Sequence, residues 1–289
     1  MSFGLRFAMR QLIRPTTALG EKMTTLDQQA LADGVSRLLR AEPFVEAAWL
    51  AWSLGRGAGD RYSDVDVLAL AIDGKFVEAS RSVASKLATV APIVLSNSLF
   101  GGRVLNSVTR SWARFDISFI EAAELGRYNA RHLKPLFNKG ERTPPERADL
   151  KYRTAPDGLL MLVQEFYRVL GLVVVGVGRE EYVLLVSGVE HLRRMTIDLM
   201  LEENSVAPEN RGGALHRRPL LTSAQYQALL SLPPLSATRE STIEAHRAFS
   251  EIFIPRAKAL AAQIGMPWPA ELAAATYECL HKNIGLTIE

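Results

Sequence analysis

The sequence has very little cysteine and no clustered histidine. Cys279 is the single cysteine among 289 residues, which excludes an intramolecular disulfide and any zinc site built from several cysteines. The five histidines are scattered and show no ligand spacing of the His-x-x-x-His kind, so we expect no zinc site. This cysteine usage fits a reducing compartment, and we expect a cytoplasmic protein.

Neither strong charge nor a long apolar run is present. Lys and Arg number 34 against 31 Asp and Glu, a net charge of +3, and this is weaker than the basic stripe of a dedicated nucleic-acid binder. A membrane span needs roughly 20 consecutive apolar residues, whereas the nearest run, residues 169–177, is interrupted by Gly171 and Gly176. We interpret that run as buried core. We therefore expect neither a nucleic-acid nor a membrane partner, and the sequence does not indicate an oligomeric state.

Hydrophobic periodicity divides the chain into two parts. Residues 1–23 form a basic N-terminal extension, and residues 24–147 mix strand and helix patterns. A polar, proline-containing stretch at residues 138–147 marks the boundary, and residues 148–289 show helical periodicity. The expected strands are residues 45–53, 64–71, 92–99, 103–109 and 113–120, and the expected later helices are residues 158–176, 180–203, 223–231, 240–264 and 269–284. The sequence predicts an α/β domain with a mixed sheet, followed by an all-α helical bundle.

Three aspartates carry the strongest chemical signal. Asp64 and Asp66 are separated by one residue, so on a strand their carboxylates lie on the same face. Such a pair repels unless a cation lies between the two groups, and Mg²⁺ prefers oxygen ligands of this kind. Asp116 stands between Phe115 and Ile117, where an uncompensated carboxylate is costly to bury. If the two strands are neighbours, the three acids form one magnesium site.

A glycine-bearing loop, residues 53–57, precedes the acid pair. Ser53 is expected to end a strand, and Gly55 and Gly57 allow a sharp turn that presents backbone N–H groups to an anion. Arg56 adds a charge that suits phosphate. A phosphate-binding turn shortly before an acid pair is an arrangement that serves metal-assisted phosphoryl transfer. Asp60, further along the loop, is interpreted as a turn former.

These residues resemble the nucleotidyltransferase superfamily that includes aminoglycoside and lincosamide adenylyltransferases. The family pattern is a Gly-Ser turn, a spacer, an Asp-x-Asp strand and a third acid on a following strand. The resemblance is sharpest over residues 47–70 and weaker over residues 113–136 and the helical half. Trp52 is a departure, because the family has glycine immediately before the serine. A tryptophan side chain there either turns into the sheet or obstructs the phosphate pocket.

The resemblance implies Mg²⁺-dependent transfer of a nucleoside monophosphate, AMP from ATP, to a hydroxyl of a small-molecule acceptor. An antibiotic is among the candidate acceptors, and resistance would be the corresponding role. The implied metal ligands are Asp64, Asp66 and Asp116, and the implied nucleotide-binding residues are Ser53, Gly55, Arg56, Gly57 and Ser63. Glu165 is a candidate general base in the substrate-binding helical domain, weighed against a salt bridge with Arg168.

The acceptor and the activity itself leave alternatives open. A polycationic aminoglycoside favours an acidic pocket, and the candidate acids of the helical half are Glu165, Glu180, Glu181, Glu190, Asp198, Glu202 and Glu203. One alternative is a protein-modifying or toxin–antitoxin-type nucleotidyltransferase. The other is a nucleotide-binding protein without activity, whose phosphate site Trp52 has closed.

Overall fold

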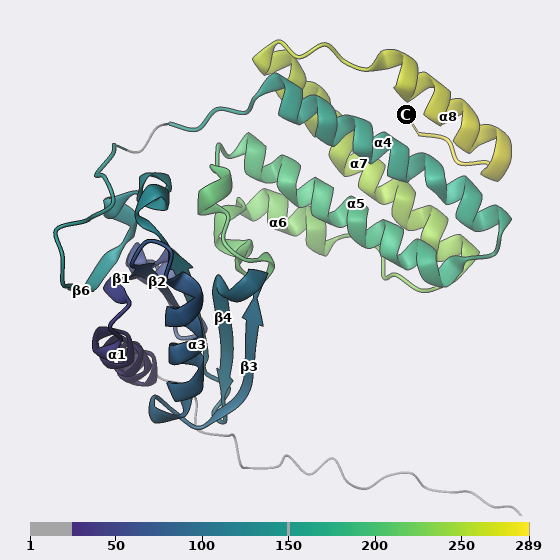
Figure 1. Cartoon of the computed structure of the whole chain (residues 1–289). Coiled ribbons are helices and arrows are strands. Elements are labelled where there is room, and N and C mark those ends of the chain that lie inside the picture. The colour runs from purple at the N-terminus through teal and green to yellow at the C-terminus, as the bar shows by residue number, and fades with distance from the viewer. Residues whose placement is uncertain (1–24, 149–150, 289) are drawn as a thin grey trace, which may run out of the picture. The chain divides into compact units, whose positions relative to one another are not determined.

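The structure is a computed structural model that describes residues 25–148 and 151–288. The chain divides into two compact units, residues 1–148 and 149–289, which are described separately. The division lies next to the predicted domain boundary, and the predicted basic extension falls outside the described residues. Figure 1 shows a sheet with helices in the first unit and helices alone in the second. The α/β domain with a mixed sheet and the following helical domain are therefore as the sequence predicts.

The first unit contains a six-stranded sheet in the order β3-β4-β5-β2-β1-β6. Its strands are β1 (Val45–Leu50), β2 (Val65–Ala71), β3 (Ile93–Leu99), β4 (Val104–Thr109), β5 (Arg114–Ile120) and β6 (Lys134–Asn138). The central pair β2 and β5 is parallel, and the other neighbours are antiparallel. The central strand β5 carries Phe115, Ile117, Phe119 and Ile120, and aromatic and β-branched residues of this kind pack well on a pleated surface.

The two faces of the sheet have different coverings. Helices α1 (Thr25–Ala41) and α3 (Phe76–Lys86) pack on the face formed by the odd-numbered residues of β2 and β5, such as Val67 and Ile117. The even-numbered residues lie on the opposite face because side chains alternate along a strand. Further along these strands, that face packs Leu68 and Leu70 against the buried Trp49. Asp66 and Asp116, near the starts of β2 and β5, have even numbers and therefore lie on the face without α1 and α3.

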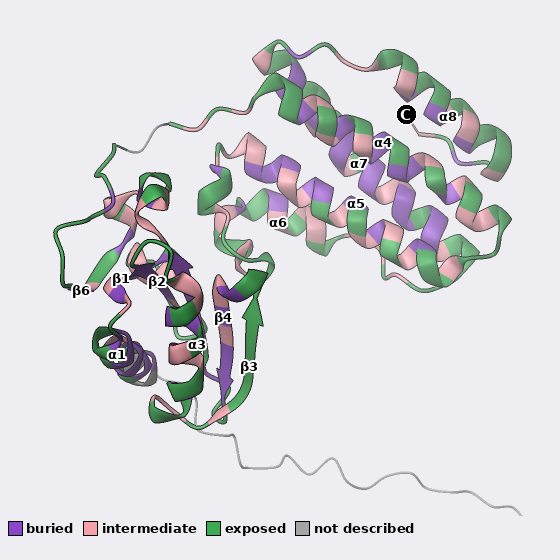
Figure 2. Ribbon diagram, in the orientation of Figure 1, coloured by how far each residue is buried: buried purple, intermediate pink, exposed green. Residues whose placement is uncertain are grey.

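The second unit is built from five helices, with short 3-10 turns between α5 and α6. These are α4 (Pro156–Gly178), α5 (Tyr182–Glu203), α6 (Ser223–Leu230), α7 (Arg239–Ile264) and α8 (Ala270–Ile284). Figure 2 shows buried residues along α4, α5 and α7, which share one apolar core. Phe166 of α4 and Phe253 of α7 stack in it with ring centroids 3.7 Å apart.

Helix α4 is long and apolar enough, by length and composition alone, to cross a membrane. Its residues Leu159, Val163, Phe166 and Leu170 are buried in the core of the helical unit, which is how a core helix of a folded domain behaves. The prediction that the run 169–177 is wholly buried is wrong in part. Val173 is buried, but Leu172 is 46% and Val175 is 43% exposed, because one side of α4 faces a hollow beside α5.

Candidate active site

A row of polar side chains crosses the middle of the sheet. Asp66 of β2 lies directly opposite Asp116 of β5, and Asn106 of β4 lies opposite Asp116 on the other side. Residues paired across strands point to the same face, so all three lie on the face without α1 and α3. The Asn106 amide nitrogen donates a hydrogen bond of 2.7 Å to the Asp116 carboxylate. The structure therefore brings the predicted acids of the two strands together.

The charges of these acids oppose one another. The pKa of Asp66 is raised from 3.8 to about 7, first by burial of its carboxyl group and then by the neighbouring charges of Asp116 and Asp64. Burial also raises the pKa of Asp64, while the Arg114 guanidinium acts in the opposite direction. The pKa of Asp66 lies near neutrality because its ionised form would be buried and also close to like charges. A bound cation would relieve this repulsion.

Arg114 is a site residue that the sequence analysis missed. It forms an ion pair with Asp64 and donates a hydrogen bond of 3.2 Å to the backbone carbonyl of Tyr62. Extending the parallel β2–β5 register by one residue places Asp64 opposite Arg114. The alternation of β5 was a usable signal, since Arg114 stands two residues before Asp116 and shares its face.

The three aspartates do not form a ready metal cluster. Within residues 25–148 and 151–288, no group of three or more His, Cys, Asp or Glu side chains is placed to hold a metal ion. Asp64 turns to Arg114, whereas Asp66 and Asp116 remain side by side on neighbouring strands. The predicted three-ligand set stays a prediction, and the structure shows a close pair with Asp64 beside it. Two carboxylates with crowded charge still suit the oxygen-ligand chemistry of Mg²⁺.

The glycine-bearing loop begins with a one-turn helix, α2 (Trp52–Gly55). The prediction that the strand continues to Ser53 is wrong, because β1 ends at Leu50 and Ser53 lies in α2. The Ala51 N–H still donates to the Asp66 carbonyl at 2.9 Å, and the Gly55 N–H then closes the turn on the Ala51 carbonyl at 3.0 Å. The turn therefore starts directly beside Asp66.

The two glycines of this loop have structural reasons of their own. A Cβ at Gly55 would lie 2.6 Å from the Leu50 carbonyl oxygen and 2.5 Å from that of His132, so only glycine fits between these backbones. Gly57 has a φ of 69°, in the left-handed region that glycine adopts without strain. Its N–H donates to the Leu54 carbonyl at 3.2 Å. Nucleotide binding by these two glycines stays a prediction. The same holds for Ser53 and for the half-buried Arg56.

Trp52 occupies a backbone conformation that favours glycine. Its φ is 47° and its side chain is 42% exposed, so the indole does not turn into the core of the sheet. A side chain in the left-handed region costs about 1–2 kcal/mol. Glycine would take this turn without strain, whereas the tryptophan takes it at a cost.

The second part of the loop is held by a buried glutamine. The Gln28 side-chain amide of α1 donates to the carbonyls of Asp60 at 2.9 Å and Ser63 at 2.6 Å. Asp60 accepts from the Tyr62 N–H at 2.8 Å, which confirms it as a turn former, and its own N–H donates to the Ser63 hydroxyl. Ser63 thus shapes the turn before Asp64. Gln28 was missed, although it lies three residues before Leu31 on the apolar stripe of its helix.

Glu165 lies in the other compact unit, on α4. Arg168 donates two hydrogen bonds of 2.7 Å to its carboxylate, and the His191 imidazole nitrogen lies 3.5 Å from it. The sequence offered two interpretations of Glu165, a general base or a salt bridge with Arg168. The structure contains the salt bridge. The hydrogen bond from Arg168 lowers the pKa of Glu165, which makes this carboxylate a weaker base than an ordinary glutamate.

Comparisons with known proteins add little to this geometry. No protein-family model matches the sequence, and no curated protein matches it either. Among solved structures, the chain is similar to the crystal structure of an aminoglycoside 6-adenyltransferase from Bacillus subtilis. The two share 14% sequence identity with a TM-score of 0.42, over 87% of this chain and 96% of that chain. A likeness of this size does not carry the activity of that enzyme over to this chain.

Proposed function

We propose that the first unit is a Mg²⁺-dependent nucleotidyltransferase domain. The observation that carries the proposal is the Asp66–Asp116 pair on adjacent strands, on the face without α1 and α3 and beside the α2 turn. The raised pKa of Asp66 is a second support, since it reflects a carboxyl group that is buried beside the charges of Asp116 and Asp64. The proposed reaction transfers a nucleoside monophosphate, AMP from ATP, to a hydroxyl of a small-molecule acceptor and releases pyrophosphate.

The roles of the residues follow from their places. Asp66 and Asp116 would hold Mg²⁺, and Asn106 orients the Asp116 carboxylate through its hydrogen bond. The metal would supply neutralisation of the triphosphate and in-line geometry. Asp64 would join the ligands when Arg114 releases it, and the guanidinium would then be available to the phosphates.

The phosphate-binding part of the proposal rests on the α2 turn. Ser53, Gly55, Arg56 and Gly57 would contact the triphosphate there, whereas Ser63 supports the turn before Asp64. A proton from the acceptor hydroxyl would go to Asp116 or to a base outside this unit. A second candidate function is nucleotide binding without transfer, because the exposed Trp52 side chain stands at the start of this turn. Modification of a protein hydroxyl is the third outcome that the experiment separates.

The test is pyrophosphate release by the full chain with Mg²⁺, each of the four nucleoside triphosphates and a panel of hydroxyl acceptors. Activity that Asp66→Asn abolishes and the exposed helix variant Asp33→Asn leaves intact supports the proposal. A nucleotide-dependent thermal shift without pyrophosphate release supports binding alone. Labelling of a protein instead of a small acceptor supports the protein-modifying alternative. The absence of both a thermal shift and pyrophosphate release with every nucleotide would overturn the proposal.

A further inference from the structure

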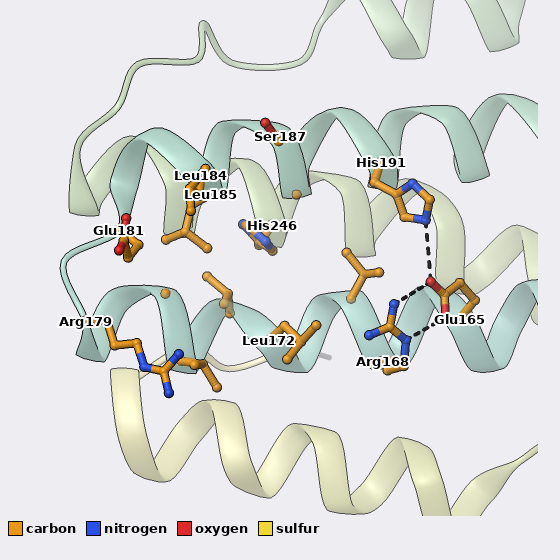
Figure 3. A pocket seen from close by; sticks show the side chains of 15 residues that line it. Glu165, Arg168, Leu172, Arg179, Glu181, Leu184, Leu185, Ser187, His191 and His246 are labelled. Atoms are coloured by element: carbon orange, nitrogen blue, oxygen red, sulfur yellow. Dashed lines mark hydrogen bonds and ion pairs between the residues drawn. The ribbon is translucent and has the colours of Figure 1, made fainter.

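A hollow of about 630 Å³ lies in the helical unit between α4 and α5, with His246 of α7 also lining it (Figure 3). Its volume is within the range of small-molecule sites, which span roughly 300–1,000 Å³. The larger part of its lining is apolar: Val169, Leu172, Val173, Val175, Leu184 and Leu185. Leu172, Val175 and Leu184 are each more than 40% exposed, so apolar surface is left open on both helices.

Two glycines show how the hollow is shaped. A Cβ on Gly176 of α4 would clash with the Leu185 side chain of α5, so the two helices are in close contact there. Gly188, one helical turn further along α5, also lines the hollow, but a Cβ on it would meet nothing within 4 Å. The space beside Gly188 is therefore not filled by any described side chain.

One of the residues that line this hollow, His246, is both polar and buried. His246 is 1% exposed, and its Nδ1 lies 2.6 Å from the Thr242 carbonyl oxygen. A carbonyl only accepts, so Nδ1 carries the proton and donates, which leaves Nε2 as an acceptor. Burial lowers the pKa of His246, which keeps the ring neutral at pH 7. Within the described part of the chain, the bond to Thr242 is the hydrogen bond found for this side chain.

The charges at the two ends of the hollow compensate one another. Glu165 is bonded by Arg168 and approached by His191 at one end, as Figure 3 shows. At the other end Arg179 and Glu181 bring one charge of each sign. A strongly charged ligand therefore gains no net attraction here.

We infer that this hollow binds an uncharged, largely apolar small molecule that donates one hydrogen bond to His246 Nε2. The volume of the hollow fits a small molecule, and its apolar lining fits an apolar ligand. The Nε2 atom of the buried His246 accepts one hydrogen bond, which fits a ligand with a single N–H or O–H donor. The inference goes beyond the proposed nucleotidyl transfer and does not rest on it. It needs neither nucleotide nor Mg²⁺ in its test.

The probe is N-phenyl-1-naphthylamine, a neutral apolar fluorophore with one N–H group. Titration of the full chain is expected to give a saturable, one-to-one rise in fluorescence. Gly188→Leu fills the hollow and is expected to weaken binding at least tenfold without lowering the melting temperature, since leucine favours a helix over glycine. Gly158→Leu, the same change at an exposed glycine of α4 with open space around it, is the matched control and should bind as the unaltered chain does.

The donor is tested with His246→Leu and with 1-phenylnaphthalene, which lacks the N–H. The substitution is expected to weaken the amine about fivefold or more and to leave the hydrocarbon unchanged. If Gly188→Leu does not fold, Leu172→Trp fills the hollow from the α4 wall and gives the same readout. The inference would be overturned if the probe did not bind saturably, or if the variants that fill the hollow bound it as well as the unaltered chain does. Sedimentation that shows a second copy of the chain covering this face would also overturn it.

Discussion

The candidate site acids of the two units differ in their partners. In the sheet, Asp66 and Asp116 lie side by side, and within the described residues neither forms a salt bridge. In the helical unit, the candidate acids are bonded to arginine in the pairs Glu165–Arg168, Glu190–Arg193, Glu202–Arg211 and Glu203–Arg256. Uncompensated negative charge thus gathers on the sheet, and this is where a cation gains most.

The same difference bears on the acceptor. A polycationic aminoglycoside needs acids that are free to pair with it, and the acids named above already pair with arginines. Asp198 adds little, because burial raises its pKa and the nearest charges include Arg217 and Arg211. The pairing of four of the seven candidate acids with arginine therefore counts against a polycationic acceptor in the proposed function.

The largest expected effect is on nucleotidyl transfer, where a substitution in the sheet is compared with one in the helical unit. Asp66→Asn is expected to lower nucleotidyl transfer by about 10³-fold or more, because it removes a metal ligand. Glu165→Gln is expected to change the rate less than about threefold, because that carboxylate is engaged by Arg168. The measurement is pyrophosphate release for both variants under one set of conditions. The reverse order of effects would make Glu165 the base and disprove the metal assignment.

The pH dependence of stability comes next. The pKa of Asp66 is about 7 in the folded chain and 3.8 without burial, so the folded state binds this proton more tightly. Its contribution to stability is full below pH 4 and is lost as the pH rises through 7. Between pH 4 and pH 8 we expect the unfolding free energy of Asp66→Asn to gain about 4 kcal/mol relative to the unaltered chain. Denaturant unfolding at both pH values measures it.

Mg²⁺ provides the control for that titration. At pH 8 the cation is expected to raise the melting temperature of the unaltered chain and to leave Asp66→Asn unchanged, because binding to the folded state stabilises it. Equal shifts for both proteins would show that the cation acts elsewhere. A stability difference that does not change with pH would show that Asp66 is not crowded by its neighbours.

The next prediction concerns Glu202, an acid of the helical unit that is paired with an arginine. Tyr152 and Thr154 donate to Glu202 at 2.8 and 2.7 Å, and Arg211 forms an ion pair with it while both side chains are 14% exposed. Glu202→Gln is expected to cost about 2 kcal/mol, because it leaves a buried arginine without its charge partner. Glu78→Gln, at an exposed position, is the control and should unfold as the unaltered chain does. Thermal unfolding of both variants decides it.

The smallest effect concerns the tryptophan of the α2 turn. Trp52→Gly is expected to alter stability by no more than about 1 kcal/mol, since relief of the left-handed strain is offset by the entropy of glycine. It is expected to lower the KM for the nucleotide roughly threefold if the indole crowds the phosphates. Trp112 has a φ of 63° and is 75% exposed, so Trp112→Gly is the matched control. An unchanged KM for Trp52→Gly would remove the suggestion of a closed phosphate site.

Much of the fold could be predicted because its signals are local. Alternation along residues 64–71 and 113–120 predicts strands, and it places Asp64 and Asp66 on one face whatever the rest of the chain does. The end of β1 could not be predicted, because apolar residues continue past Leu50 and only the positive φ of Trp52 turns the chain away. The exposed part of the run 169–177 was missed for a related reason. An apolar helix does not reveal which of its sides a neighbour leaves open.

The sequence by itself determined that this protein has a mixed sheet followed by helices, and that its acids sit on one strand face. Periodicity and residue spacing act over a few residues, so they survive without knowledge of the fold. Only the tertiary structure decided which partner each acid meets: Arg114 for Asp64, Asn106 for Asp116, Arg168 for Glu165. These pairings depend on strand register and helix packing, and interactions between charges depend on the distance and burial that such packing creates.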